Sequence, residues 1–238
     1  MQTALCSKTL LGVLLVAAAP YAARAEKAAE RLDDAATVFQ EIMSAGDKGI
    51  PQDLLDKAHC VVIVPGVKKG AFIVGGKYGR GFVTCRTASN HNWGAPGAVR
   101  MEGGSIGWQI GGSESDIILL VMNEEGMRKL LESKFTLDAD AGVAAGPVGR
   151  TAQASTDAKM TAKILSYSRS RGLFGGLSVG GATLRNDLDE NKELYGKPLT
   201  NKEIVMGHVA APPSFSRLRA ELNKYSRSEE GQRARTKQ

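Results

Sequence analysis

Glycine inside strand-like segments is the feature that most constrains the fold of this chain. From about residue 60 to residue 185 the sequence is rich in β-branched and apolar residues, and clusters of Gly, Pro, Asn and Ser divide it. We expect strands at residues 60–64, 71–77, 81–86, 98–111, 116–122, 141–148, 159–169 and 177–185. Many of the 28 glycines fall inside these segments, where glycine marks bulges, tight bends or close backbone approach. The sequence therefore predicts a strongly curved or barrel-like antiparallel sheet.

The segment before the strands has the pattern of an amphipathic helix. Between residues 26 and 44, Leu32, Ala36, Phe39 and Met43 recur at steps of four and three, which places them on one helical face. The polar face is mainly acidic, whereas helices that lie on membranes carry Lys and Arg there. We therefore expect this helix to dock on the core of its own domain.

Further helices are expected between and after the strands. Capping residues, helical periodicity and stop signals place them at residues 51–58, 124–131, 187–195, 201–207 and 214–225. The predicted fold class is α+β, a Gly-rich, curved or barrel-like antiparallel sheet with an N-terminal helix and C-terminal helices.

The first 25 residues have the three parts of a secretory signal peptide. Lys8 precedes an apolar run at residues 10–19, and Ala23-Arg24-Ala25 provides a cleavage site of small residues. The run is too short to span a membrane. We expect cleavage after Ala25 and a periplasmic or secreted protein, with a domain at residues 26–213 and a basic helix and tail at 214–238.

The positive charge of the chain is concentrated at its ends. The formal net charge is +6, and loss of Lys8 and Arg24 with the signal peptide lowers it to +4. Residues 214–238 carry seven bases and three acids, a net charge of +4 that equals the whole charge left after cleavage. The expected domain is therefore neutral overall, and an anion site in it requires local clustering of bases. A neutral domain without interleaved aromatics also argues against nucleic acid as a partner.

Two cysteines, Cys60 and Cys85, remain after the expected cleavage. An oxidising compartment would permit a disulfide between them. If residues 60–64, 71–77 and 82–86 form a meander, however, the first and third strands lie about 9.5 Å apart, beyond the reach of a disulfide. This geometry favours unpaired thiols, although the sequence leaves the pairing open.

Enzyme motifs are present only as fragments. Ser105 and Ser178 each occupy the centre of a Gly-x-Ser-x-Gly sequence, but the helix that a nucleophile elbow requires does not follow either serine. The candidate bases His59, His91 and His208 are read as structural or solvated residues, and no zinc-ligand spacing such as Cys-x-x-Cys occurs. We expect no catalytic residue, no metal site and no cofactor.

Basic residues cluster where turns are expected. Lysine and arginine beside hydroxyls and backbone N–H groups provide the donors that a phosphate group accepts. The candidate lipid or anion site is Lys68 and Lys69 at a first turn, Lys77 and Arg80 at a second, and Arg169 and Arg171 in a serine-rich run. The alternative is that each is an ordinary solvated residue.

Four blocks in order resemble the SYLF family, over about residues 30–200. The blocks are Val64-Pro-Gly-Val-Lys-Lys-Gly70 continuing to Gly81, Gly103-Gly-Ser-Ile-Gly107 continuing to Gly112, Ala144-Ala-Gly-Pro-Val-Gly-Arg150, and Ser166-Tyr-Ser-Arg-Ser-Arg-Gly-Leu-Phe-Gly-Gly176. Eukaryotic members of that family bind phosphoinositides and, in yeast, actin filaments, while bacterial members are exported.

The resemblance implies non-enzymatic binding of lipid or another polyanion, through the six basic residues named above. Actin and phosphoinositides are not sensible partners in a bacterial envelope, so acidic phospholipid is the expected partner there. A structural or protein-interaction module of the cell envelope, with an envelope protein as partner, is the alternative function. An esterase using Ser105 or Ser178 is a third.

Overall fold

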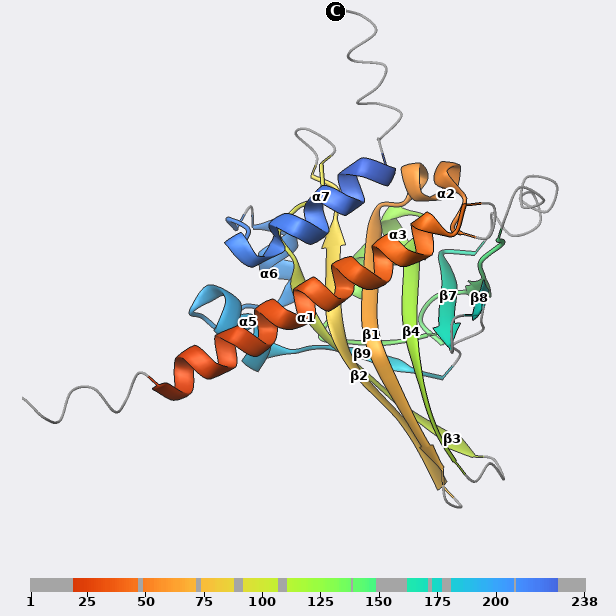
Figure 1. Ribbon diagram of the computed structural model, residues 1–238, viewed down its shortest axis with the longest axis horizontal. Coiled ribbons are helices and arrows are strands. Elements are labelled where there is room, and N and C mark those ends of the chain that lie inside the picture. The colour runs from red at the N-terminus through yellow and green to blue at the C-terminus, as the bar shows by residue number, and fades with distance from the viewer. Residues whose placement is uncertain are drawn as a thin grey trace, which may run out of the picture.

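A strongly curled sheet forms the centre of the protein (Figure 1). The computed structural model describes residues 19–46, 49–71, 74–87, 92–106, 111–137, 139–148, 162–170, 173–176, 181–207 and 209–226. Over these residues the strands are β1 (Cys60–Ala71), β2 (Val74–Cys85), β3 (Gly97–Ile106), β4 (Gly111–Val121), β5 (Lys134–Thr136), β6 (Val143–Ala145), β7 (Ile164–Ser170), β8 (Leu173–Gly176) and β9 (Thr183–Asn186).

The strand order is β5-β9-β3-β2-β1-β4-β7-β6, and β8 pairs with β7. Every pairing in this described sheet is antiparallel except that of β6 with β7, which is parallel. The predicted class, α+β with a strongly curved sheet, is confirmed. The short strands β5 and β8 lie outside the segments that the sequence predicts as strands.

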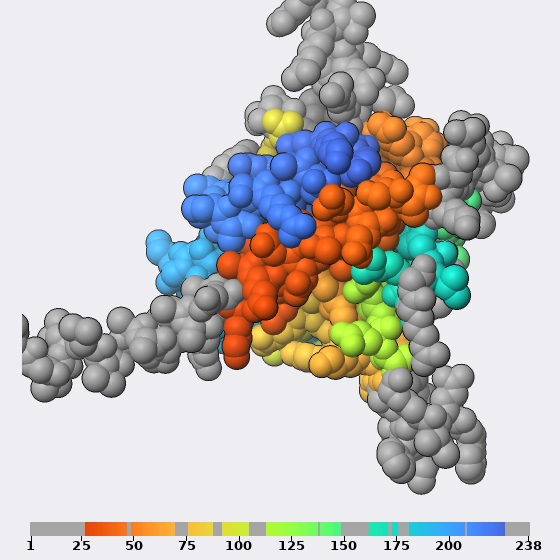
Figure 2. All heavy atoms as spheres, viewed as in Figure 1, coloured from red at the N-terminus to blue at the C-terminus, as the bar shows by residue number. Residues whose placement is uncertain are grey.

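Helices pack against both faces of the sheet. They are α1 (Ala19–Ser44), α2 (Gln52–Lys57), α3 (Glu124–Leu130), α5 (Leu188–Tyr195), α6 (Asn201–Met206) and α7 (Ser216–Tyr225), which follows a 3-10 turn at Pro213–Phe215. Helix α1 crosses the strands diagonally, and α7 lies beside it on the same face (Figures 1 and 2). None of the helices within the described residues has the length and apolar character needed to cross a membrane.

The two faces of the sheet belong to two hydrophobic cores. Val61 and Ile63 pack in the first core with Leu32, Ala36 and Phe39 of α1, and Met43 packs at its margin. The predicted docking of α1 through this face is therefore confirmed. Cys60, Val62, Val64 and their neighbours enter the second core, inside the curl of the sheet, which α3 and β5 help to close. Burial on both faces explains why β1 begins as a continuous apolar run.

A bulge at Pro65-Gly66 lets β1 continue where the sequence predicts its end. The pairing register shifts between Val64 and Val67, and Gly66 has φ of +56°. Its N–H donates to Asp116 Oδ1 at 3.0 Å. Opposite the bulge, a Cβ on Gly81 would lie 2.0 Å from the carbonyl oxygen of Ile63, so only glycine fits there. The expected bulges and close backbone approach are thus present, and β2 runs unbroken past them.

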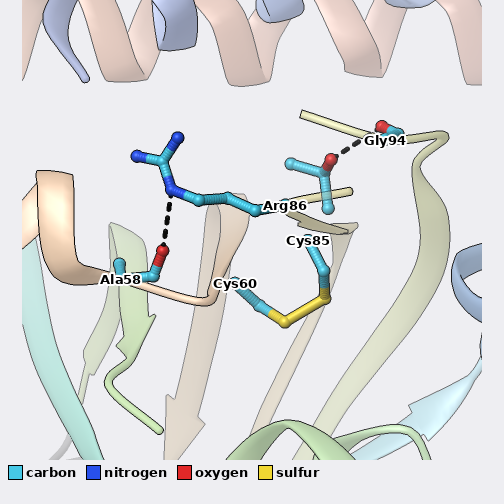
Figure 3. Close-up of a disulfide and its surroundings, with 6 residues drawn as sticks. Ala58, Cys60, Cys85, Arg86 and Gly94 are labelled. Atoms are coloured by element: carbon cyan, nitrogen blue, oxygen red, sulfur yellow. Dashed lines mark hydrogen bonds between the residues drawn. A yellow bond between two sulfur atoms is a disulfide. The ribbon is translucent and has the colours of Figure 1, made fainter. Parts of the chain in front are cut away.

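Cys60 and Cys85 form a disulfide, so the expectation of unpaired thiols is wrong (Figure 3). The two residues are directly paired on β1 and β2, and their Cα atoms lie 4.0 Å apart. The error has a physical reason: residues 74–77 and 81–85, predicted as parts of two strands, belong to one strand, β2, which makes the cysteines neighbours across a hairpin. Beside the disulfide, Arg86 Nε donates to the carbonyl of Ala58 at 3.1 Å.

Candidate anion-binding site

Strands β1 to β4 extend together beyond the helices as a tapering projection (Figure 1). We call this projection the ribbon and define it as residues 67–71, 74–79, 101–106 and 111–115. Its strand order is β3-β2-β1-β4, so β1 and β2 form the centre and β3 and β4 the edges. Lys68, Lys69 and Lys77 therefore lie within strands, and the prediction that they occupy turns is wrong. The bulge at Pro65-Gly66 is the reason, because it extends β1 instead of ending it.

The pairing register sends the three lysines to different faces of the ribbon. Gly103, Lys77, Lys69 and Ser113 form one row across the four strands. Glu102, Tyr78, Lys68 and Glu114 form the adjacent row. Residues directly opposite each other share a face, and neighbours along a strand do not. Lys69 and Lys77 thus lie side by side on one face, while Lys68 lies on the other, between Tyr78 and Glu114.

Lys69 and Lys77 form a like-charged pair without a neutralising partner among the described residues. Burial, and then the charge of Lys77, lowers the pKa of the Lys69 ammonium below its usual value. No ion pair within the described part of the chain involves either residue. Like charges directly opposite each other in a sheet are destabilising. An anion bound between these two ammonium groups would relieve that repulsion.

Hydroxyl groups lie on the same face as the lysine pair. Ser113 is in the same row, and Ser115, two residues further along β4, pairs with Val67. Ser115 is buried, and its Oγ has no hydrogen-bond partner in the described structure. A buried hydroxyl without a partner is costly, so it marks a position that a ligand can satisfy. Two ammonium groups with two hydroxyls are suited to hold a phosphate.

Arg80 belongs to a buried ion cluster and not to the lysine pair. Its Nε lies 3.0 Å from Asp187 Oδ2, a close ion pair whose angle does not make a hydrogen bond. Its Nη1 lies 3.8 Å from Glu190, and Arg31 of α1 pairs with the same glutamate. Both acids are buried. This cluster joins α1, α5 and β2, so the first role of Arg80 is to hold helices on the sheet.

Arg169 has a similar structural role at the other end of α1. Its Nε donates to Asp116 Oδ2 at 2.9 Å, and its Nη1 pairs with Glu41 of α1. Arg169 therefore ties α1 to β4 and β7. Arg171, the last of the predicted site residues, lies outside the described residues.

Within the described residues, no geometry supports the catalytic alternative. Ser105 lies in β3 opposite Gly75, and the described chain resumes at Gly111 as strand β4, not as a helix. His59 is exposed and precedes β1, at the end of that strand away from the ribbon. Ser178, His91 and His208 lie outside the described residues. Across the part of the chain that the structure covers, no group of His, Cys, Asp or Glu is arranged to hold a metal ion.

Sequence reasoning missed Ser113 and Ser115 and the pairing of Lys69 with Lys77. The signal that could have found the pairing is symmetry about residues 72–73, the connection between β1 and β2. Cys60 pairs with Cys85 and Lys69 with Lys77 in one hairpin that is interrupted by a single bulge. Reading residues 60–85 as one hairpin would have predicted the disulfide, whereas the lysine pair also depends on the one-residue shift of register at the bulge.

Comparison with known proteins identifies relatives over most of the chain. Residues 102–225 match the family described as Ysc84: Las17-binding protein actin regulator. Protein YSC84 of Saccharomyces cerevisiae is 33% identical over 175 residues, which cover 72% of this chain and 37% of that protein. SH3 domain-containing YSC84-like protein 1 of Rattus norvegicus is 30% identical over 218 residues, or 90% of this chain and 62% of that protein. The chain thus spans less than two thirds of the length of these relatives.

Proposed function

Because this chain belongs to the Ysc84 (SYLF) family, a family of binding and regulatory domains, we propose that it binds anionic phospholipid without catalysing a reaction. The observation that supports this proposal is the Lys69–Lys77 pair, two cations directly opposite each other with no acid beside them among the residues that the structure describes. A phospholipid phosphate supplies the missing negative charge. The proposed setting is the periplasm or the cell exterior, after cleavage of residues 1–25.

The position of the pair favours a surface ligand over a small soluble one. The ribbon projects away from the helices, so a flat surface can approach it without meeting α1 or α7 (Figure 1). Lys69 and Lys77 are each only partly exposed, and their ammonium groups are less well hydrated than those of free lysines. Partial desolvation strengthens the interaction with a phosphate and reduces its screening by salt.

Vesicle co-sedimentation of residues 26–238 tests the proposal. The double variant Lys69→Gln/Lys77→Gln should lose binding to phosphatidylglycerol-containing vesicles, because both phosphate partners are removed. It should also be more stable than the wild type, by up to about 1 kcal/mol, because the like-charge repulsion is removed. Vesicles of phosphatidylcholine alone are the lipid control, and a salt series should weaken the wild-type binding.

Two control variants separate the site from other cations. Lys68→Gln removes a lysine one residue away on the opposite face, between Tyr78 and Glu114, and should bind acidic vesicles like the wild type. A full-length variant with glutamine at the tail positions Arg227, Arg233, Arg235 and Lys237 measures nonspecific binding by the tail. Unchanged binding by the folded Lys69→Gln/Lys77→Gln variant would refute the site, and complete loss in the tail variant would assign binding to the tail.

A second candidate function is protein interaction in the cell envelope. The row on the opposite face of the ribbon favours it, since Tyr78 is 48% exposed between charged residues. Exposed tyrosine in a polar surrounding is typical of protein interfaces. Two of the relatives are named LAS seventeen-binding protein 3, a name that states a protein partner for those proteins. Pull-down of one stoichiometric envelope protein, with no vesicle binding, would favour this function.

A further inference from the structure

A pocket lies at the end of β2 that is remote from the ribbon. Its volume is about 300 Å³, and it is an open pocket lined by the segment after β2, helix α6, residues 209–211 and helix α7. Its lining has an apolar part and a polar part. Trp93, Ile204 and Val205 supply apolar surface, and Arg219 and Asn223 of α7 supply polar groups.

The pocket carries one positive charge that nothing in the described structure neutralises. Arg219 makes no ion pair with a described residue, and no carboxylate is among the described residues that line the pocket. Arg219 is an exposed residue, and its guanidinium lies 5.9 Å from the ring centre of Phe215, one helical turn earlier. Arg219 and Asn223 are four residues apart on one helix and so share a face. Together they present N–H donors to the same volume.

The frame of the pocket is held in place by contacts within the fold. The indole N–H of Trp93 donates to Ser226 Oγ at 2.9 Å, and the guanidinium of Arg86 lies 4.4 Å from the centre of the Trp93 ring. Helix α6 begins with a capping box in which Thr200 and Glu203 satisfy each other's backbone N–H groups. A preformed pocket requires little ordering when a ligand binds.

We infer that this pocket binds a small organic carboxylate. The carboxylate accepts hydrogen bonds from Arg219 and Asn223, and the apolar body of the ligand lies against Trp93 and Val205. The volume is at the lower limit for small-molecule sites, so it suits a compact acid and is too small for a two-chain phospholipid. The inference is therefore independent of the lipid site on the ribbon.

Nuclear magnetic resonance of the ¹⁵N-labelled chain, residues 26–238, provides the test. The chain has two tryptophans, so a Trp108→Phe variant identifies the indole N–H signal of Trp93. Titration with phenylacetate, and separately with octanoate, should shift that signal with saturation. Phenylacetamide has the same shape as phenylacetate and no charge, and it should bind at least about tenfold more weakly, the loss expected for one charged hydrogen-bonded contact.

Three variants test whether phenylacetate binds in this pocket. Arg219→Gln should weaken phenylacetate binding by about tenfold or more. Arg217→Gln is the matched control on the same helix, because Arg217 pairs with Asp33 of α1, outside the pocket; it should bind as the wild type does. Val205→Phe should fill the pocket and abolish binding in a chain whose spectrum remains folded.

Three results would overturn the inference. They are no saturable shift of the Trp93 signal with either acid, equal affinity for phenylacetamide and phenylacetate, and equal weakening by Arg219→Gln and Arg217→Gln. The first result would show that the pocket does not bind carboxylates of this kind. The second would show that the pocket does not recognise the charge of the ligand, and the third that Arg219 does not contact it.

Discussion

At the scale of single residues, the glycines of β2 have different physical roles. A Cβ on Gly81 would lie 2.0 Å from the Ile63 carbonyl oxygen and 2.7 Å from the Val64 Cα, both backbone atoms at the bulge. Gly81→Ala should therefore lower the free energy of unfolding by about 2–3 kcal/mol, because the two strands must separate. Urea denaturation measures this change. Gly76→Ala, in the same strand with nothing within 4 Å of the added Cβ, should change stability by less than about 0.5 kcal/mol; equal losses would contradict the steric argument.

At the scale of elements, a buried ion cluster docks α1 and α5 on the sheet. Burial, the largest effect, raises the pKa of Glu190 above its ordinary value. The charges of Arg31 and Arg80 lower this pKa, and the charge of Asp187 raises it, so that the net shift is upward. A carboxyl whose folded pKa is raised stabilises the fold below its ordinary pKa, and this contribution is lost as pH rises through the raised value. Glu190→Gln cannot titrate and lacks the contribution.

The wild type should therefore gain stability relative to Glu190→Gln as pH falls from about 7 to about 4. Urea unfolding of both proteins across this pH range measures the difference in their free energies of unfolding. The other acidic residues are present in both proteins, so their contributions cancel in this difference. A difference that stays constant, or that shrinks on acidification, would show that the arginines outweigh burial at this glutamate.

At the scale of the whole molecule, the two ends of the described chain complete one core. Phe215, Leu218 and Leu222 are buried in the first core with α1, and the Phe39 and Tyr225 rings meet edge to face at 6.2 Å. A chain that ends after Pro213 should lose about 5 kcal/mol or more from these three side chains, which approaches the whole stability of a domain. A chain that ends after Ser226 should keep the wild-type melting temperature. Thermal unfolding of both chains is the measurement, and cooperative melting of the shorter one near the wild-type temperature would contradict this account.

Local patterns in the sequence determined the fold class, the buried face of α1 and the need for bulges. Helical period, β-branched content and glycine placement are properties of neighbouring residues, so they can be read without knowing the pairing. The four SYLF-like blocks identified the family for the same reason. The bases of the candidate site were also found, but as separate residues in supposed turns.

Only the tertiary structure decided which of those residues meet. Side chains alternate faces along a strand, so one bulge at Pro65-Gly66 sets the face of every residue beyond it. The register before the bulge brings Cys60 to Cys85, and the shifted register beyond it brings Lys69 to Lys77 and places Lys68 on the opposite face. Arg80 and Arg169 looked equivalent to the lysines in sequence, yet their acidic partners come from distant elements. Partners far apart in sequence are chosen by packing, and packing exists only once the chain has folded.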